Sequence, residues 1–159
     1  MDTDTKAYKG KALVIDIDGT LSNIEHRRHY VMNKPTKWKG TKMWREFNSS
    51  MHLDTVNPWC LEIIERFKKD YSVILCTGRM TEFMKVTVKW LTDNQIHFTH
   101  LYMREDGDYR GDDIVKEEIL KEKILPQYDI LFTVDDRQRV VDMWRKNGLT
   151  CLQCDEGNF

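Results

Sequence analysis

Residues 11–20, KALVIDIDGT, decide the fold of this chain. Residues 11–17 form a short apolar run rich in β-branched residues, which is typical of a strand buried on both faces. Asp16 and Asp18 stand at alternating positions where this run ends, and Gly19 then releases the chain into a turn. Two carboxylates this close repel each other unless a cation lies between them or one holds a proton. The alternative is an ordinary Asp-Gly turn, although two acids directly after a buried strand are much less common than Asp-Gly alone.

The rest of the chain alternates apolar runs with segments of helical spacing. We expect further strands at 71–76, 98–103 and 130–134, and an edge strand at 149–153. We expect helices from Asn57-Pro58 onward, over 81–94, over 112–123 and over 137–147, the last ended by Gly148. This alternation predicts an α/β fold, with a Rossmann-like parallel sheet and helices on both faces. In such a fold the active site lies beyond the carboxyl ends of the strands.

Residues 23–56 interrupt the alternation. They hold no clear strand and are rich in Lys, Trp and His, and two aromatic residues three positions apart predict a short helix over 41–49. Because this insertion follows the first strand directly, we expect it to form a small cap over the site, within a single domain that spans 1–159. Trp38 and Trp44, with their neighbouring lysines, either stack a nucleic-acid base or form the aromatic core of the cap.

Polar side chains stand at the ends of the other strands. The second strand ends in 76–79, CTGR, where a hydroxyl and free N–H groups at a helix N-terminus would form a phosphate cradle. Lys116 lies near a helix start, where the helix dipole disfavours a cation, and Asp135 and Asp136 end the fourth strand. Each signal has an ordinary alternative: a capped turn, a solvated lysine or an N-cap acid. Together they place carboxylates, a hydroxyl turn and a lysine at one sheet edge, an arrangement that suits Mg²⁺ and a substrate phosphate.

Composition excludes several classes of protein. The 159 residues carry 25 Lys and Arg against 26 Asp and Glu, for a formal net charge of -1. This excludes a globally basic nucleic-acid binder, though not a local basic patch. No stretch approaches the roughly 20 apolar residues of a membrane helix, and the first residues lack the apolar core of a signal peptide. We therefore expect no membrane partner and a cytoplasmic location. Cys151 and Cys154 form a lone C-x-x-C, more consistent with two ordinary thiols than with a metal or redox pair.

In this order the strand-end residues resemble the four motifs of the haloacid-dehalogenase phosphatase superfamily, and the resemblance covers nearly the whole chain. Within that superfamily the chain most resembles the 3′-phosphatase domain of phage polynucleotide kinase/phosphatase. That likeness rests on residues 26–30, 104–118, 134–145 and 157–159.

The resemblance implies a role for each site residue. Asp16 would be the nucleophile that forms an aspartyl-phosphate. Asp18 would protonate the leaving sugar oxygen and then activate water, and Lys116 would neutralise the charge of the phosphate and of Asp16. The remaining implied residues are Thr77, Gly78, Arg79, Arg27 and Asp112 for phosphate or substrate binding, and Asp135 and Asp136 for Mg²⁺ together with Asp16 and the Asp18 carbonyl.

The resemblance thus implies an Mg²⁺-dependent phosphatase that hydrolyses the 3′-phosphate ends of polynucleotides in nucleic-acid repair. One alternative is a phosphatase of free nucleoside monophosphates, because residues 31–56 are longer and richer in Trp and Lys than that domain leads us to expect. A non-catalytic nucleic-acid-binding module is a second alternative, against which the complete set of motif residues argues. The chain lacks a G-x-x-x-x-G-K-[ST] motif, so any 5′-kinase, like any ligase, would be a separate partner.

Overall fold

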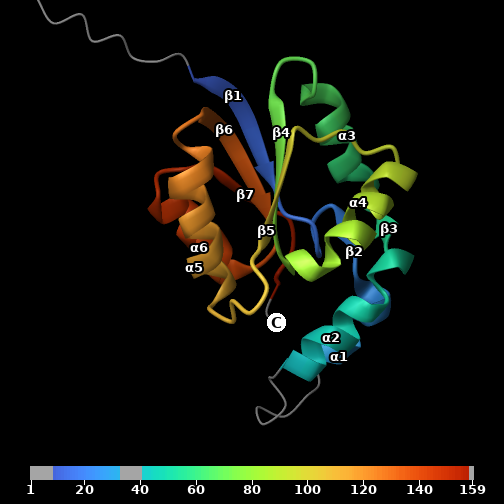
Figure 1. Ribbon diagram of the computed structural model, residues 1–159. Helices are drawn as coiled ribbons and strands as arrows, with labels where there is room; N and C mark the ends of the chain where they lie inside the picture. Colours follow the sequence, from blue (N-terminus) through green and yellow to red (C-terminus); the bar gives the residue numbers. More distant parts are fainter. Residues whose placement is uncertain (1–8, 33–40, 158–159) are drawn as a thin grey trace, which may run out of the picture.

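A parallel sheet forms the centre of the molecule. The computed structural model describes residues 9–32 and 41–157. Within these residues five parallel strands form one sheet in the order β5-β4-β1-β6-β7 (Figure 1). They are β1 (Gly10–Ile15), β4 (Ser72–Met80), β5 (His100–Arg104), β6 (Tyr128–Asp135) and β7 (Cys151–Gln153). The predicted parallel sheet is confirmed, and β7 is an edge strand as expected.

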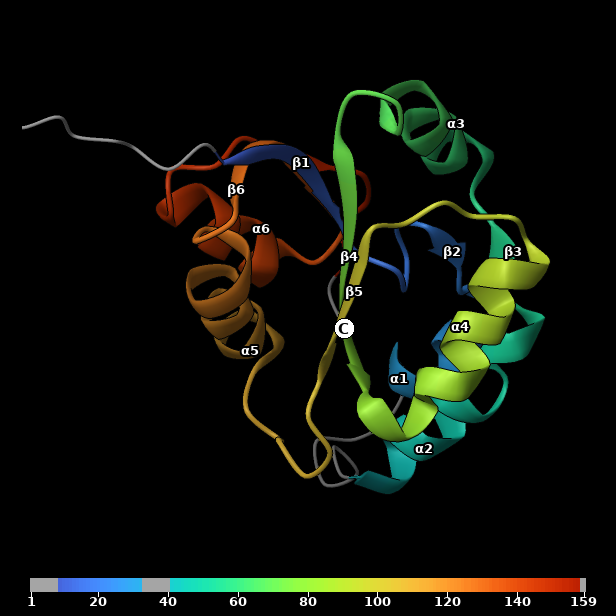
Figure 2. The same cartoon turned by 45° about the horizontal axis from the view of Figure 1, so that its top comes forward.

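The central strand is buried on both faces, as its composition predicts. Ala12 and Val14 pack with α5 (Asp112–Ile119) and α6 (Gln138–Lys146), whereas Ile15 and Ile17 pack with α3 (Pro58–Phe67) and α4 (Met84–Asp93). These two helix pairs cover opposite faces of the sheet (Figure 2). Burying each valine or isoleucine side chain contributes about 1.5–3 kcal/mol, so β1 is held firmly and its end is a rigid platform. None of the described helices is long and apolar enough to cross a bilayer.

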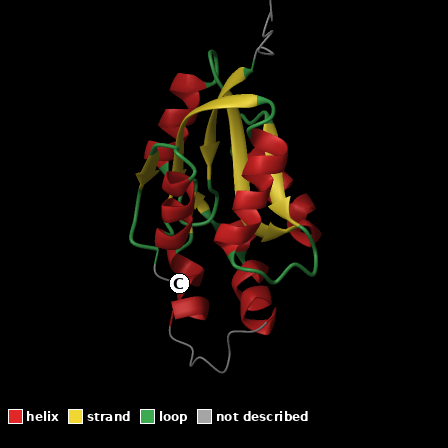
Figure 3. Ribbon diagram, turned by 90° about the vertical axis from the view of Figure 1, so that its left-hand side faces the viewer, coloured by secondary structure: helices red, strands yellow, loops and turns green. Residues whose placement is uncertain are grey.

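The insertion lies beyond the carboxyl ends of the strands (Figures 1 and 3). It contains α1 (Glu25–Met32), α2 (Thr41–Ser49) and η2 (Met51–Leu53), so the predicted helix over 41–49 is confirmed. The expectation of no strand was wrong at the two ends, where β2 (Ser22–Asn23) and β3 (Thr55–Val56) pair antiparallel. Two-residue strands are too short to leave a periodic pattern in the sequence. They pair because the chain enters the insertion and leaves it at the same place.

The second strand of the sheet runs further than predicted. β4 continues to Met80, and its register with β5 shifts between Thr77 and Met80. A short 3-10 helix, η3 (Thr81–Phe83), then precedes α4. The prediction that residues 77–79 lie at a helix N-terminus was therefore wrong. These residues form an irregular strand end, where Gly78 allows the carboxylate of Asp112 to pack against the backbone, because any Cβ would overlap with it.

Candidate active site

The strand ends bring the predicted site residues together. Eight of the ten line one cavity of about 530 Å³ at the carboxyl edge of the sheet, namely Asp16, Asp18, Thr77, Gly78, Arg79, Asp112, Asp135 and Asp136. The other two, Arg27 and Lys116, are buried and reach these carboxylates from the α1 and α5 sides. Residues that span 120 positions of sequence therefore meet because parallel strands end at one edge.

Lys116 is the cation at the centre of the site. Its Nζ lies 2.7 Å from Asp16 Oδ1, 2.9 Å from Asp135 Oδ2 and 3.7 Å from Asp112 Oδ2, and the residue is 1% exposed. Burial by itself would lower the pKa of Lys116, but the carboxylates outweigh that effect and raise this pKa well above its ordinary value. Lys116 is therefore a buried, charged ammonium group in contact with Asp16, and not a solvated surface lysine.

Asp16, Asp135 and Asp136 form an acidic cluster. One oxygen from each lies within 4.8 Å of the other two. Burial, together with Asp135 and Asp136, raises the pKa of Asp16 well above its ordinary value despite the opposing charge of Lys116. Burial and the charge of Asp135 likewise raise the pKa of Asp136 to about 7.

The cluster has the chemistry of a divalent-cation site. Asp136 Oδ2 is buried and has no hydrogen-bond partner among the residues that the structure describes, which is costly unless a cation satisfies it. Three carboxylates with no nitrogen or sulfur donor suit Mg²⁺, a hard cation that prefers oxygen ligands. Asp135 is also held by Lys116 and by Trp144 Nε1 at 3.2 Å, so its carboxylate has a fixed orientation. The residues present therefore fit Mg²⁺.

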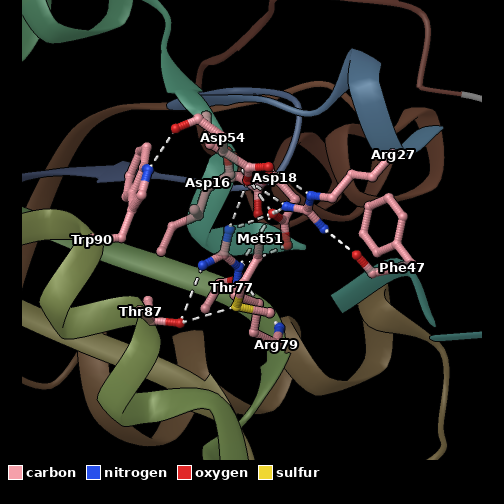
Figure 4. Close-up of polar contacts among 12 residues, drawn as sticks. Asp16, Asp18, Arg27, Phe47, Met51, Asp54, Thr77, Arg79, Thr87 and Trp90 are labelled. Carbon is pink, nitrogen blue, oxygen red and sulfur yellow. Dashed lines mark hydrogen bonds and ion pairs between the residues drawn. The ribbon is translucent and has the colours of Figure 1, made fainter. Parts of the chain in front are cut away.

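The side chain of Asp18 is outside this cluster and contacts two arginines (Figure 4). Arg79 donates to it from Nε at 3.0 Å and from Nη2 at 2.6 Å, and Arg27 donates from Nη2. Burial by itself would raise the pKa of Asp18, but Arg79 and Arg27 outweigh it and hold that pKa well below its ordinary value. Asp18 is therefore an ionised carboxylate beside the Asp16 site.

Two site residues were missed by the sequence analysis. Asp54, fully buried, accepts hydrogen bonds from Arg27, Arg79 and His26. Arg104, at the end of β5, donates to the carbonyls of Gly78, Asp108 and Arg110 and to the carboxylate of Asp112. The sequence signal for Arg104 was its position as a charged residue at the end of a strand, just as Asp135 ends another strand of the sheet. Asp54 offered no comparable signal, because it is a single acid in an irregular segment.

The outer part of the cavity is lined by aromatic residues and arginines. It includes Trp44 and Arg45 from α2, Tyr109 and Arg110 from the β5–α5 loop, and Arg139 from α6. The indole of Trp44 packs edge-on against Phe47, with ring centroids 5.6 Å apart, and also lies 5.8 Å from the Arg137 guanidinium. Trp44 therefore packs against an aromatic residue within the insertion, as one of the two alternatives predicted, and it also lines the cavity; base stacking by Trp44 stays a prediction. Trp38 lies outside the described residues.

The C-x-x-C pair is chemically ordinary. Cys151 and Cys154 are both free thiols. Burial raises the pKa of Cys154 to about 12, so its reactive thiolate form is rare at neutral pH.

Comparisons with known proteins agree with this site. The family model of the polynucleotide kinase phosphatase domain matches residues 10–159. A chain of the Pnkp1/Rnl/Hen1 RNA repair complex is 33% identical, with a TM-score of 0.78; the match covers 100% of this chain and 46% of that one. A second structure of a Pnkp1/Rnl/Hen1 complex has a chain 34% identical, with a TM-score of 0.79 and coverages of 100% and 50%. The present chain thus spans about half the length of those chains.

A more distant similarity identifies the fold. A haloacid dehalogenase-like hydrolase family protein from Streptococcus pneumoniae is 15% identical, with a TM-score of 0.61, and the match covers 90% of this chain and 83% of that one. The sheet, the strand-end carboxylates and the buried lysine are thus set in a haloacid-dehalogenase-like fold. The chain belongs to the family of polynucleotide kinase phosphatase domains, and is a phosphoric monoester hydrolase of the haloacid-dehalogenase superfamily.

Proposed function

We propose that this protein is an Mg²⁺-dependent phosphatase that removes 3′-phosphates from polynucleotide ends through an aspartyl-phosphate on Asp16. The observation that carries the proposal is the position of Asp16. It is in contact with the buried ammonium of Lys116 and next to the unsatisfied oxygen of Asp136, at the floor of an open cavity.

The first step needs a carboxylate to attack an anionic phosphate, and the site offsets that repulsion. Lys116 holds positive charge 2.7 Å from Asp16, and Thr77 and Gly78 line the same cavity for the phosphoryl oxygens. Asp16, Asp135 and Asp136 would hold Mg²⁺, with the Asp18 carbonyl as a further ligand, and Mg²⁺ when bound supplies charge that stabilises the phosphoryl group. The bond from the Asp16 oxygen to phosphorus forms as the ester bond breaks, which divides the hydrolysis into two easier steps.

Asp18 would transfer the protons in both steps. Its ionised state suits the second step, in which it accepts a proton from the water that attacks the aspartyl-phosphate. In the first step it must hold a proton for the leaving sugar oxygen. The incoming phosphate is an anion, and an anion nearby raises the pKa of a carboxyl group, so substrate binding favours this protonated state. Arg27 and Arg79 would act on the substrate through Asp18, since both are buried against its carboxylate.

The outer cavity favours a polynucleotide over a free nucleotide. Arg45 and Arg139 are exposed at its edge and can contact backbone phosphates, and Tyr109, 67% exposed, offers a surface for a base. The insertion that supplies Arg45 and Trp44 would act as the cap that determines which substrate enters. A kinase or ligase that works on the same ends is the partner we propose, in keeping with the repair complex that contains the similar chains.

The experiment that tests this function measures phosphate release from four substrates, with Mg²⁺ and with EDTA. They are a 3′-phosphorylated oligonucleotide, the matching 5′-phosphorylated one, and free 3′- and 5′-nucleotides. We expect Mg²⁺-dependent release from the 3′-phosphorylated oligonucleotide, with kcat/KM about tenfold or more above that for the free 3′-nucleotide, because base stacking contributes about 1–3 kcal/mol per base.

The outcomes separate the alternatives. Preference for free 5′-nucleotides would make the protein a nucleotidase, and no release from any substrate would favour a binding module. The variant Asp16→Asn, which keeps the size of the side chain, should bind the oligonucleotide without turnover. Beryllium fluoride with Mg²⁺ should bond to Asp16, and its appearance on another residue would refute the proposed nucleophile.

A further inference from the structure

The chain from the end of β7 to Gly157 supports the two acids at the end of β6. It runs past the carboxyl ends of the strands (Figure 1). The backbone N–H of Cys154 donates to the carbonyl of Asp135 at 3.1 Å. The N–H of Gly157 donates to the carbonyl of Asp136 at 3.0 Å, and Gln153 Nε2 donates to the same carbonyl at 3.3 Å. Three hydrogen bonds from this short segment therefore hold the backbone of both acids.

Gly157 packs directly against a carboxylate oxygen. It is buried, and a Cβ in its place would lie 2.7 Å from Asp136 Oδ2, too close for two atoms that are not bonded. The backbone N and Cα of Arg137 would lie 3.0 Å from that Cβ, so the side chain of Asp136 would have to move. A Cβ at Gly19 would overlap with the same oxygen. Unlike Gly19, Gly157 does not have a positive φ, so space and not backbone conformation requires glycine there.

The two neighbouring acids are held in different ways. The Asp135 carboxylate accepts hydrogen bonds from Lys116 at 2.9 Å and from Trp144 at 3.2 Å. Asp136 Oδ2 accepts none from the part of the chain that the structure describes, so packing against glycine backbone limits its position. A carboxylate oxygen held by packing keeps its lone pairs for a cation, because no donor competes for them.

We infer that residues 153–157 are a support of the metal site, with Gly157 as the positioning residue for Asp136, an inference that rests on the Mg²⁺-dependent function proposed above. Asp16, Asp135 and Asp136 would hold the ion. The segment fixes the backbone of two of these ligands, and the missing side chain of Gly157 leaves the space that Asp136 Oδ2 occupies. Gly157 therefore acts on the metal site only through Asp136.

The test compares Gly157→Ala with Gly10→Ala, the same substitution at the opposite end of β1 from Asp16. Neither glycine has a positive φ, and a Cβ at Gly10 would also meet a side chain, the ring of Tyr128, at 3.0 Å. Urea unfolding in EDTA and at a series of Mg²⁺ concentrations gives the Kd for Mg²⁺, because Mg²⁺ binds only the folded state. Each Kd comes from the increase over EDTA, so a general loss of stability does not enter it.

The expected result is a change in metal affinity at one glycine and not at the other. Gly157→Ala should raise the Kd for Mg²⁺ about tenfold or more above that of Gly10→Ala, since residues that orient metal ligands contribute about 10- to 100-fold to metal affinity. Equal Kd values for the two variants would overturn the inference.

A larger ion separates the displacement of one oxygen from general damage. Mg²⁺ requires nearly octahedral ligands at about 2.0–2.1 Å, whereas Ca²⁺ accepts a flexible geometry at about 2.3–2.6 Å. Gly157→Ala should therefore weaken Ca²⁺ binding less than about threefold, well below its effect on Mg²⁺. An equal rise in Kd for both ions would indicate general disruption of the site and would overturn the inference.

Gln153→Met provides a second test if Gly157→Ala does not fold. It removes the 3.3 Å hydrogen bond to the Asp136 carbonyl and keeps the length of the side chain. Because the N–H of Gly157 still binds that carbonyl, the Kd for Mg²⁺ should rise only about 3- to 10-fold. A Kd equal to that of Gly10→Ala would again overturn the inference.

Failure of this inference differs from failure of the proposed function. A wild-type protein that Mg²⁺ does not stabilise would overturn the inference together with the metal site. A wild-type protein that binds Mg²⁺ but releases no phosphate from any substrate would contradict the proposed function alone.

Discussion

Replacing Lys116 by methionine tests the electrostatic balance of the site. Methionine has a similar length and no charge, so the change removes the ammonium and little of the packing. In the wild-type protein Lys116 Nζ lies 2.7 Å from Asp16 and 2.9 Å from Asp135, with 1% of the residue exposed. The variant therefore leaves two buried carboxylates without their shared cation, beside the further carboxylates of Asp112 and Asp136.

The size of the effect follows from those contacts. A hydrogen bond to a charged group contributes about 1.5–3 kcal/mol, and removing one partner of a buried ion pair costs about 3–5 kcal/mol. Since the two bonds of Lys116 share one charge and are not additive, we expect its loss to lower the free energy of unfolding by about 3–5 kcal/mol in EDTA. Mg²⁺ at about ten times its dissociation constant should restore about 1.4 kcal/mol, because it binds only the folded state.

Urea unfolding with EDTA and with Mg²⁺ measures this effect. The control is Lys121→Met, because Lys121 is exposed and its 2.9 Å ion pair with Glu117 lies on the surface, where such pairs contribute about 0–1 kcal/mol. Phosphatase activity of Lys116→Met should fall about 100- to 1000-fold or more, as when a charge-stabilising donor is removed. A change in unfolding free energy below about 1 kcal/mol, equal to that of the control, would refute the view that Lys116 holds the carboxylates together.

Three further predictions concern the metal cluster and the thiols. Because the pKa of Asp136 is raised from 3.8 to about 7, the folded protein without metal should lose stability as pH rises between these values. Asp136→Asn should remove this dependence of stability on pH, raise the free energy of unfolding at pH 8 by on the order of 2–4 kcal/mol, and abolish the Mg²⁺-induced rise in Tm. An unchanged pH dependence of stability would contradict the raised pKa of Asp136. Gly19→Ala and Gly107→Ala should both lower the free energy of unfolding by about 1–2 kcal/mol, because φ is +84° at Gly19 and +82° at Gly107, a backbone conformation that strains alanine. Only Gly19→Ala should also lose the Mg²⁺ response, because its Cβ would overlap with the Asp136 carboxylate whereas Gly107 has open space; equal Mg²⁺ responses would contradict this. Cys154, with its pKa near 12, should react with iodoacetamide far more slowly in the folded protein than in urea, and fast labelling at pH 7 would revive a redox role for the C-x-x-C pair.

The sequence by itself was sufficient for the sheet and for the residues at its edge. A β-branched run with two acids at its end identified β1, because burial on both faces requires continuous apolar sequence, and shorter apolar runs identified the other strands. Parallel strands end at one edge, so Asp16, Thr77 and Asp135 were predictable as neighbours from their positions alone. The resemblance to a phosphatase superfamily added the roles, and the family match agrees with it.

Local backbone geometry at the second strand could not be predicted in the same way. The pattern CTGR is compatible with a capped helix start and with an irregular strand end. The choice was made by contacts distant in sequence, since Gly78 packs against Asp112 and its carbonyl accepts a hydrogen bond from Arg104. Propensity is a weak guide where such tertiary contacts compete with it.

Only the tertiary structure decided how charge is balanced around Asp18. Arg27 and Arg79 are 52 positions apart, and Asp54 lies between them in sequence within an irregular segment that has no periodic pattern. The family resemblance placed Arg27 and Arg79 at the substrate site, but the sequence does not indicate that they are buried with Asp54, because an isolated acid on an irregular segment is usually solvated. They meet because the insertion folds back across the carboxyl edge of the sheet. Once water is excluded there, each charge is stable only with an opposite charge in contact.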